Sequence, residues 1–274
     1  MSTSINLLYG VIGNPISHSK SPQIHQQFAK QFDIDLEYQT INAEIGRFSE
    51  VVKDFRLHRG LGLNVTIPFK LDAFEYADEL SERARLAGAV NTLKFLEGGA
   101  VFGDNTDGVG LYRDLTENFG CSINGKRLLV LGAGGAVRGV LGPLLEAHPQ
   151  SVLIANRTTA KAIELAKLFV NHGEITGCGF SEIKNQQFDL VINGTAASLQ
   201  GEIPPLPNDL FSKHAVAYDM MYADQPTAFM RWATGRGANQ VVDGLGMLVE
   251  QAAESFFVWH SVHPNTAPVI KNLR

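Results

Sequence analysis

The stretch of residues 128–139, LLVLGAGGAVRG, limits what this chain can fold into more than any other part of the sequence. Its first four residues are apolar without a break, which is typical of a parallel strand covered on both faces. Glycines follow at once, and then a segment rich in Ala, Val and Leu with helical spacing. A strand that enters a helix through such a turn points backbone N–H groups and the positive end of the helix dipole at one place, which suits a phosphate or pyrophosphate.

The turn departs from the usual dinucleotide-binding pattern, G-x-G-x-x-G, because Val137 stands at its sixth position. The pattern is instead G-x-G-G-x-x-x-G, and an ordinary turn between a strand and a helix is the alternative interpretation. The rest of the sequence must therefore decide between the two.

The composition indicates a folded chain without a nucleic-acid or membrane partner. A length of 274 residues allows one large domain or two smaller ones, and a hydrophobic content of 45% can form a sizeable core. The net charge of −5 comes without a long basic cluster, which argues against nucleic-acid binding. Cys121 and Cys178 are too few for a disulfide scaffold and lack metal-ligand spacing, so we expect no metal site. Neither a secretory signal nor a membrane-spanning apolar run is evident, and we expect a cytoplasmic protein.

The first part of the chain alternates between strand-like and helix-like segments. We predict strands over 7–13, 36–41 and 62–66, helices over 23–31, 45–58, 69–79 and 80–87, and a hairpin of 88–95 and 100–103 joined at 97–99. This order favours a mainly parallel sheet, and ligands of such sheets bind at the carboxyl ends of the strands.

Polar side chains follow two of these strands. Ser19 and Ser21 come after the first strand, and Ser21 is also the predicted cap of the first helix. Asn64 and Thr66 lie at the end of the third strand and Lys70 follows it, so we expect these three and both serines to border one crevice suited to a polyhydroxylated or carboxylated ligand. Asp107 either caps the next helix or faces this crevice as a partner of Lys70, and both interpretations stay open.

The end of the strand predicted over 151–155 bears on cofactor choice. An NAD site usually has Asp or Glu there, whereas this chain has Asn156, Arg157, Thr158 and, further on, Lys161. Without a carboxylate a 2′-phosphate is not repelled, and Arg157 can pair with it. The sequence therefore favours NADP over NAD.

The second half continues the alternation and then returns. Strands predicted over 188–195, 215–220 and 240–242 complete a compact dinucleotide-binding domain. The helix from 244 to about 260 has no sheet partner left there, so we expect it to pack on the first domain. Of Glu250 and Gln251 in this helix, we expect one to face solvent and the other the crevice.

Seven stretches, in this order along almost the whole chain, are similar to the shikimate dehydrogenase family: 14–22, 64–70, 87–92, 103–108, 132–136, 156–158 and 244–249. The stretches 64–70 and 105–108 are the most specific. The resemblance implies reversible, NADPH-dependent reduction of 3-dehydroshikimate to shikimate, on the route to chorismate and the aromatic amino acids. It also implies NADP as the cofactor.

The predicted fold class is α/β, with two α/β domains and a cleft between them. Residues 1–106 plus 243–274 form an N-terminal, mainly parallel substrate-binding domain, and residues 107–242 form a Rossmann-like NADP-binding domain.

The resemblance also implies roles for individual residues. Ser19 and Ser21 would hold the substrate carboxylate, with Tyr222 near it, and the ring hydroxyls and the reacting oxygen would be bound by Thr66, Lys70, Asn91, Asp107 and Gln251. Lys70 would give the proton in reduction and take it in oxidation, assisted by Asp107. The cofactor site would be lined by Gly132, Ala133, Gly134, Gly135, Ala136, Asn156, Arg157, Thr158, Lys161, Met220 and Gly244, to which we add Glu82.

Two residues depart from the family pattern. Many relatives have Ser where Val137 stands, which removes a hydroxyl but leaves the backbone donors. Arg is common where Lys161 stands, and because lysine cannot form a forked pair with phosphate, the preference for NADP is softened.

Two alternatives to this function stay open. One is a relative that uses NAD or also accepts quinate, and the other is a nucleotide-binding regulatory protein without catalysis. The expected partner is a small-molecule substrate, with no nucleic acid and no membrane, and a homodimer is left open.

Overall fold

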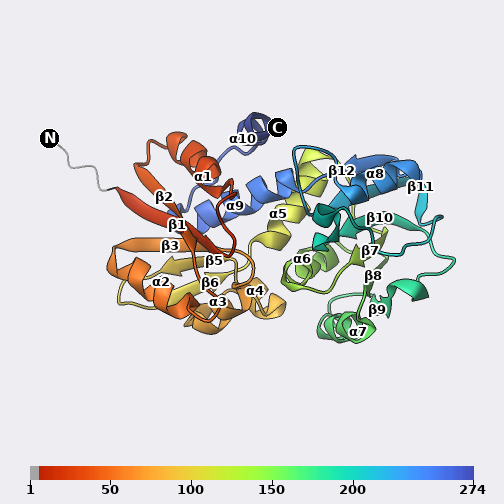
Figure 1. Cartoon of the computed structure of the whole chain (residues 1–274), viewed down its shortest axis with the longest axis horizontal. Coiled ribbons are helices and arrows are strands. Elements are labelled where there is room, and N and C mark those ends of the chain that lie inside the picture. The colour runs from red at the N-terminus through yellow and green to blue at the C-terminus, as the bar shows by residue number, and fades with distance from the viewer. Residues whose placement is uncertain (1–5) are drawn as a thin grey trace. The chain divides into compact units, whose positions relative to one another are not determined.

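The computed structural model describes residues 6–274, apart from the side chains of Ala196 and Leu199, and divides into two compact units (Figure 1). Unit 1 runs up to Gly110 and includes Val249–Arg274, and unit 2 is Leu111–Leu248. The sequence analysis drew these boundaries at 106/107 and 242/243, in loops. In the structure each boundary falls inside a helix, α5 (Asp107–Arg113) or α9 (Leu245–His260).

Unit 1 contains a six-stranded sheet with the order β2-β1-β3-β5-β6-β4. Its strands are β1 (Leu7–Gly13), β2 (Leu36–Asn42), β3 (Gly60–Val65), β4 (Glu79–Leu80), β5 (Thr92–Phe95) and β6 (Val101–Asp104). The pairs β1–β2, β1–β3 and β4–β6 are parallel, and β3–β5 and β5–β6 are antiparallel. The predicted hairpin is thereby confirmed as β5–β6.

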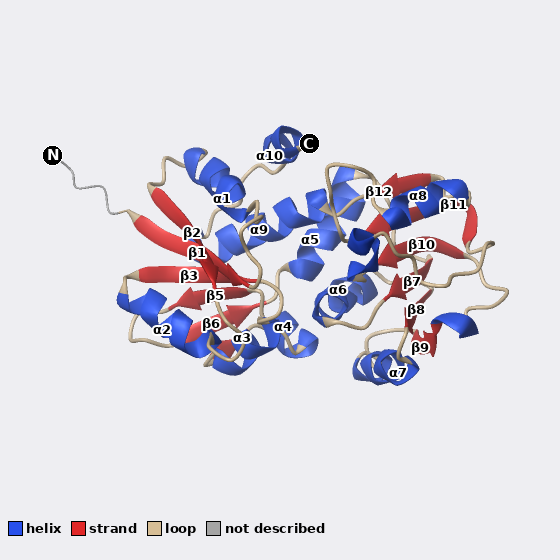
Figure 2. Ribbon diagram, viewed as in Figure 1, coloured by secondary structure: helices blue, strands red, loops and turns tan. Residues whose placement is uncertain are grey.

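Helices cover both faces of this sheet. They are α1 (Ser21–Lys30), α2 (Phe48–Leu57), α3 (Lys70–Tyr76), α4 (Glu82–Ala87) and α10 (Ala267–Leu273), together with most of α9. Ile12 of β1 packs in a core with Phe48 of α2, whereas its neighbour Val11 packs with Trp259 of α9. Because side chains alternate along a strand, α2 and α3 cover one face, and α1 and α9 cover the other (Figures 1 and 2).

Three local predictions in unit 1 are wrong. The helix predicted from residue 45 starts at Phe48, and Ile45 is 83% exposed because it precedes the helix. Leu80 is in strand β4, where pairing with Gly103 of β6 replaces the predicted helical start. Ser21 does not cap α1: the N-cap residue is Lys20, and the hydroxyl of Ser19 accepts a hydrogen bond from the Ser21 N–H at 3.2 Å.

Unit 2 contains a six-stranded sheet in which every pair is parallel, with the order β12-β11-β10-β7-β8-β9. Its strands are β7 (Arg127–Leu131), β8 (Ser151–Asn156), β9 (Ile175–Gly179), β10 (Phe188–Asn193), β11 (Phe211–Asp219) and β12 (Gln240–Val242). The sequence analysis missed β9, because its sequence ITGCG has two glycines and only one strongly strand-forming apolar residue.

The helices of unit 2 join these strands in the right order for a Rossmann-like unit. They are α6 (Gly135–Glu146), α7 (Thr159–Leu168) and α8 (Ala228–Gly235), with the π-helical turn η1 (Asp114–Asn118) after α5 and the short 3₁₀ turns η2 (Phe180–Glu182) and η3 (Ala196–Gln200). Leu128–Leu131 are each fully buried, as the uninterrupted apolar run predicted.

The return of the last long helix to the first unit is confirmed. Trp259 of α9 stacks on Tyr9 of β1 with the ring centroids 4.5 Å apart, and its indole N–H donates to the Leu93 carbonyl at 3.0 Å. Within residues 6–274, none of the helices has the length and apolar character needed to cross a membrane.

Candidate active site

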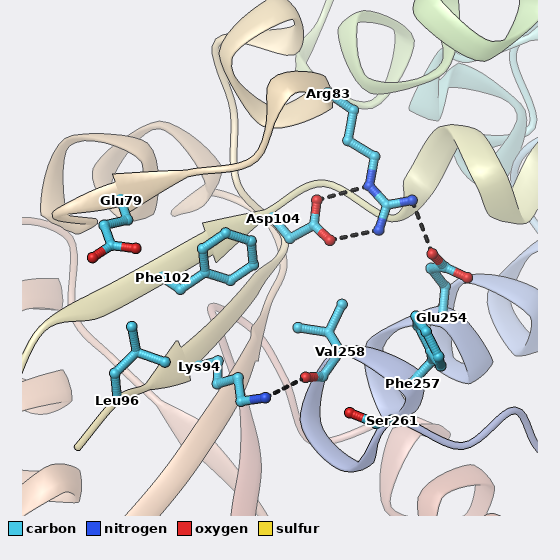
Figure 3. Close-up of a pocket in the computed structure, with 10 residues that line it drawn as sticks. All are labelled: Glu79, Arg83, Lys94, Leu96, Phe102, Asp104, Glu254, Phe257, Val258 and Ser261. Carbon is cyan, nitrogen blue, oxygen red and sulfur yellow. Dashed lines mark hydrogen bonds and ion pairs between the residues drawn. The ribbon is translucent and has the colours of Figure 1, made fainter.

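A pocket of about 450 Å³ opens in unit 1 beside β5, β6 and the end of α9 (Figure 3). It is lined by Glu79, Arg83, Lys94, Leu96, Phe102, Asp104, Glu254, Phe257, Val258 and Ser261. None of these residues is a predicted site residue. Four of the predicted residues, Lys70, Asn91, Asp107 and Gln251, lie together elsewhere in unit 1.

Lys70 and Asp107 form an ion pair between Nζ and Oδ2. Lys70 begins α3 after the end of β3, and Asp107 begins α5 after β6, so two strand ends bring them together. The Lys70 side chain is 16% exposed and that of Asp107 only 3%. Of the interpretations that the sequence left open, the pairing of Asp107 with Lys70 is confirmed. The Asp107 N–H is bound by Asn105 Oδ1 at 3.2 Å.

Asn91 connects this pair to α9. Its Nδ2 donates to Asp107 Oδ1 at 2.8 Å and lies 2.9 Å from Gln251 Oε1 and from Thr106 Oγ1. Four residues predicted to bind substrate, Lys70, Asn91, Asp107 and Gln251, thus lie in one cluster. Both oxygens of the Asp107 carboxylate are held in place, one by the ammonium and one by the amide.

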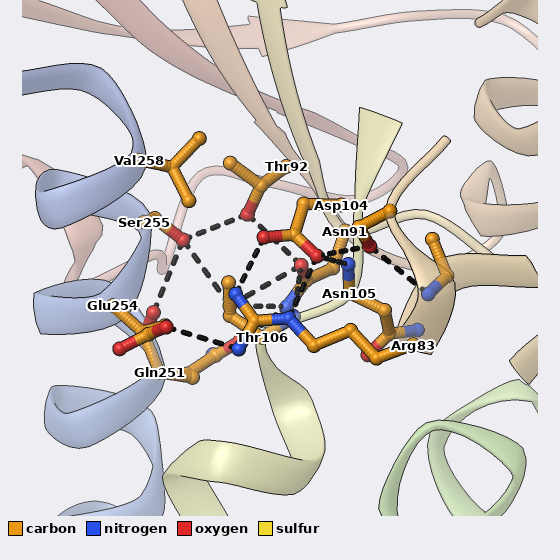
Figure 4. A network of polar contacts seen from close by, with 12 residues as sticks. Arg83, Asn91, Thr92, Asp104, Asn105, Thr106, Gln251, Glu254, Ser255 and Val258 are labelled. Carbon is orange, nitrogen blue, oxygen red and sulfur yellow. Dashed lines mark hydrogen bonds and ion pairs between the residues drawn. The ribbon is translucent and has the colours of Figure 1, made fainter. Parts of the chain in front are cut away.

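The hydroxyl side chains of Thr92, Thr106 and Ser255 are hydrogen-bonded around Asn91 and Gln251 (Figure 4). Ser255 of α9 lies 2.7 Å from Thr92 Oγ1, and its Oγ accepts from Asn64 Nδ2 at 2.9 Å. Thr106 N–H donates to Asn91 Oδ1 at 2.9 Å. Sequence reasoning missed Thr92 and Ser255. Their signal was a hydroxyl within an otherwise apolar strand or helix, which is weak.

Tyr38 of β2 forms hydrogen bonds both to β3 and to Ser21 at the start of α1. Its hydroxyl donates to Asn64 Oδ1 at 2.7 Å. Burial raises the pKa of Tyr38 well above its usual value, and a hydrogen bond with Ser21 partly offsets that rise. Tyr38 therefore stays protonated and links Ser21, at the start of α1, to Asn64 of β3. The sequence analysis took Tyr38 only as a strand residue.

The glycine turn in unit 2 has the form that a phosphate site needs. Gly132 follows β7 with φ +106°, a conformation that favours glycine, and Gly134 is the N-cap of α6 without a side-chain cap. Apart from the neighbouring residues of the turn and the backbone of α6, no atom lies within 4 Å of the place where a Cβ on Gly134 or Gly135 would stand, so space is open beside the turn. Val137 is fully buried. Its departure from the family pattern therefore lies in the core and leaves the backbone donors unchanged.

The end of β8 carries donors and no carboxylate. Asn156 Nδ2 donates to the Thr158 carbonyl at 3.0 Å, and Thr158 is the N-cap of α7 without a side-chain cap bond. Arg157, Thr158 and Lys161 are exposed. The guanidinium of Arg157, the hydroxyl of Thr158 and the ammonium of Lys161 stand at the start of one helix. These groups suit the 2′-phosphate of NADP.

The remaining predicted cofactor and substrate residues are distributed over both units. In unit 2, Met220 is buried after β11, and the Gly244 N–H donates to the neighbouring Met221 carbonyl at 3.1 Å. Tyr222 is half-buried in unit 2, and burial raises the pKa of its hydroxyl. Glu82 is the first residue of α4, in unit 1.

The expectation that Glu250 or Gln251 faces solvent is wrong. Glu250 is only 4% exposed and Gln251 is half-buried. The cause is that α9 is covered over most of its circumference, with Val249, Ala252 and Ala253 also buried.

Comparisons with known proteins agree with this division of the chain. The model "Shikimate dehydrogenase substrate binding domain" matches residues 11–93, "Shikimate / quinate 5-dehydrogenase" matches 114–200, and "Shikimate 5'-dehydrogenase C-terminal domain" matches 244–274. A curated relative from Halorhodospira halophila, named shikimate dehydrogenase (NADP(+)), is 56% identical and covers 97% of both chains.

Solved structures extend the similarity to the fold. An Ael1 enzyme from Pseudomonas putida has a TM-score of 0.92 at 46% identity, with 98% of both chains covered. Shikimate 5-dehydrogenase from Thermus thermophilus, in complex with NADP(H) and shikimate, has a TM-score of 0.85 at 31% identity, with 97% of both chains covered.

The fold and the two groups of residues define a two-unit α/β oxidoreductase, with a parallel nucleotide-binding sheet and a separate polar cluster around a lysine–carboxylate pair. The family is equally well defined. This chain belongs to the shikimate dehydrogenase family, which confirms the resemblance noted in its sequence.

Proposed function

We propose that this chain catalyses the reversible, NADPH-dependent reduction of the ketone of 3-dehydroshikimate to shikimate, on the route to chorismate and the aromatic amino acids. The observation that carries the proposal is the buried Lys70–Asp107 pair, which Asn91 and Gln251 complete in the unit that matches a substrate-binding domain. A relative of the same name and cofactor at 56% identity supports it.

Lys70 is the proton donor in this reaction. Reduction of a ketone leaves negative charge on its oxygen, and a positioned acid must neutralise that charge. The Lys70 ammonium gives its proton to this oxygen in reduction, and the amine takes the proton back in oxidation. Asp107 orients Lys70 through the ion pair and accepts a hydrogen bond from a substrate hydroxyl. NADPH supplies the hydride when it is bound.

Polar side chains of unit 1 make most of the other substrate contacts in this proposal. Ser19 and Ser21 bind the carboxylate, and the ring hydroxyls are bound by Thr66, Asn91 and Gln251. Tyr222, in unit 2, is a further proposed substrate residue. Hydroxyl and amide groups suit a polyol, because each can donate or accept as the ring requires.

The cofactor residues divide into two groups. The backbone N–H groups of 132–136 face the pyrophosphate at the start of α6, with Met220 and Gly244 beside them. Arg157, Thr158 and Lys161 hold the 2′-phosphate, with Asn156 at the strand end. Glu82 completes the proposed set.

A matrix of four rates tests the function. Reduction of the nicotinamide is followed by absorbance with shikimate or quinate, each with NADP or NAD. We expect the highest kcat/KM with shikimate and NADP. A higher value with quinate or with NAD would assign the chain to the first alternative. Absence of reduction in all four assays would favour a regulatory nucleotide-binding protein.

A cytoplasmic location and a homodimer are the finer parts of the proposal and remain predictions. Light scattering of the purified chain tests the second. A mass of twice 29.8 kDa supports a homodimer, and a mass of 29.8 kDa contradicts it.

A further inference from the structure

Arg83 holds two buried carboxylates within unit 1 (Figures 3 and 4). Its Nε donates to Asp104 Oδ1 at 2.7 Å and its Nη2 to Oδ2, so the pair is forked. Its Nη1 donates to Glu254 Oε1 at 2.9 Å. The Asp104 and Glu254 side chains are only 4% and 9% exposed, compared with 28% for Arg83. One guanidinium thus joins α4, β6 and α9.

The first arm of this arrangement leads from Asp104 to the active-site carboxylate. Asp104 Oδ1 also accepts from the Asn105 N–H at 2.7 Å. Asn105 in turn donates its Nδ2 to the Ala89 carbonyl at 2.9 Å and accepts the Asp107 N–H on Oδ1. Asp104 thus binds the N–H of Asn105, and Asn105 binds the N–H of Asp107.

The second arm runs through α9. Glu254 lies three residues after Gln251, which places both on the same side of the helix. Gln251 Oε1 accepts from Asn91 Nδ2, and the same nitrogen donates to Asp107. The first arm therefore ends at Asp107, and the second reaches Asp107 through the Asn91 amide; the Asp107 carboxylate in turn pairs with Lys70.

Among the residues of this network, Arg83 matters most because its positive charge pairs with two buried carboxylates. Burial disfavours its charged form, yet the hydrogen bonds and charges of Asp104 and Glu254 outweigh burial and raise the pKa of the guanidinium. Burial by itself would raise the pKa of Asp104. The hydrogen bonds and charge of Arg83 outweigh this effect, so the pKa of Asp104 is lowered. Without Arg83, the two buried carboxylates would lose this cation, and within residues 6–274 Asp104 would keep only the Ser81 hydroxyl and the Asn105 N–H as donors to its carboxylate.

We propose that Arg83 is a positioning residue that holds the Asp104–Asp107 segment and the Gln251 turn of α9 so that Asp107 meets Lys70. This inference rests on the proposed function of Lys70 and Asp107. Arg83 touches neither of them, and it acts through Asp104 on one side and Glu254 on the other.

The pocket beside the guanidinium provides a selective test. Because Arg83 is 28% exposed and lines a pocket of about 450 Å³, a free guanidinium ion can reach the space left by Arg83→Ala. Misplacement by about 1 Å costs on the order of 10²-fold in turnover, so we expect kcat for shikimate oxidation to fall by about that factor, with KM for shikimate changed less than about threefold. Millimolar methylguanidinium should restore kcat at least about tenfold in Arg83→Ala.

Two variants keep the test decisive. Arg56→Ala removes a guanidinium that contacts the Gly99 carbonyl and the Phe95 ring, outside the network, and should show neither loss nor rescue. Arg83→Lys keeps the charge but not the fork, so it should fold with the wild-type thermal midpoint and still lose turnover, without rescue. Wild-type kcat in a folded Arg83→Ala or Arg83→Lys variant, or failure of methylguanidinium to raise kcat of folded Arg83→Ala, would overturn the proposal.

Hydrogen exchange separates this inference from the proposed function. The N–H groups of Asn105, Thr106 and Asp107 are bound within the network, so their exchange should quicken in Arg83→Lys and stay unchanged in Arg56→Ala. If wild type fails to oxidise shikimate, the proposed function fails, while the exchange rates still decide the positioning role. Unchanged exchange over 104–107 would overturn it.

Discussion

Lys70 stands at a position that a lysine does not normally favour. It is the first residue of α3, where its positive charge opposes the positive end of the helix dipole. The Asp107 carboxylate, 3% exposed, compensates that charge directly. The charge of Asp107 therefore offsets the unfavourable position of Lys70 at the start of α3. Such a position is consistent with a lysine that has a chemical role in the proposed reaction.

At the same scale, we propose that Arg157 governs the choice of cofactor. Arg157→Ala should raise KM for NADP by roughly 10- to 100-fold, the value of a lost charge-assisted hydrogen bond, and leave KM for NAD nearly unchanged. Steady-state kinetics with both cofactors measure this. Lys167→Ala removes a cation from the last turn of α7, the helix that follows Arg157, and is the matched control. An unchanged NADP/NAD preference in Arg157→Ala would contradict the specificity argument.

At the scale of elements, α9 approaches the sheet of unit 1 closely at Gly62 of β3. A Cβ on Gly62 would lie 2.5 Å from Trp259 Nε1 and 2.7 Å from the Leu93 carbonyl oxygen, two groups that are hydrogen-bonded to each other. Gly62→Ala should therefore force α9 away from β3 and destabilise the chain by about 1–3 kcal/mol.

Thermal or urea unfolding measures this effect. Gly235→Ala in α8 is the control, because no atom lies within 4 Å of its added Cβ and it should be neutral or slightly stabilising. Equal stability of Gly62→Ala and wild type would show that α9 does not depend on this contact.

Local patterns in the sequence predicted most of these elements but few of the contacts between them. The apolar run before the glycine turn and the Gly-Gly turn of the hairpin act over a few residues, so they could be read directly. Arg83 contacts Asp104 and Glu254 at separations of 21 and 171 residues, and Asn64 meets Ser255 at 191. Such pairs leave no periodic signal. Short elements such as β4 and β9 were missed because pairing with a neighbour, more than propensity, makes them strands.

At the scale of the whole molecule, the aromatic core of unit 1 makes stability depend on pH. His25 is fully buried and stacks on Tyr38 with ring centroids 4.5 Å apart, and burial lowers the pKa of His25 to about 3. An unfolded histidine takes up a proton below about pH 6.5, whereas the folded one stays neutral until about pH 3. The unfolded state thus binds more protons in this window, and stability falls as the pH falls through it.

This histidine should contribute a slope of about 1.4 kcal/mol per pH unit between pH 6 and 4, which His25→Phe should remove. Urea unfolding in a Trp232→Phe background follows unit 1 through the fluorescence of Trp259. His58→Gln, at a residue whose side chain is 71% exposed, should keep the wild-type slope. The same acid slope in His25→Phe and wild type would contradict a neutral buried His25.

The central claim is that Lys70 transfers the proton in the reaction of this chain with shikimate. The most direct test compares turnover with binding in Lys70→Ala, using initial rates of NADP reduction and calorimetric titration with shikimate, with Lys53→Ala on α2 as the control. We predict that kcat falls by about 10²- to 10⁴-fold while Kd for shikimate changes by less than about threefold. Loss of shikimate binding with turnover intact at saturation would contradict the account and assign Lys70 to holding the substrate.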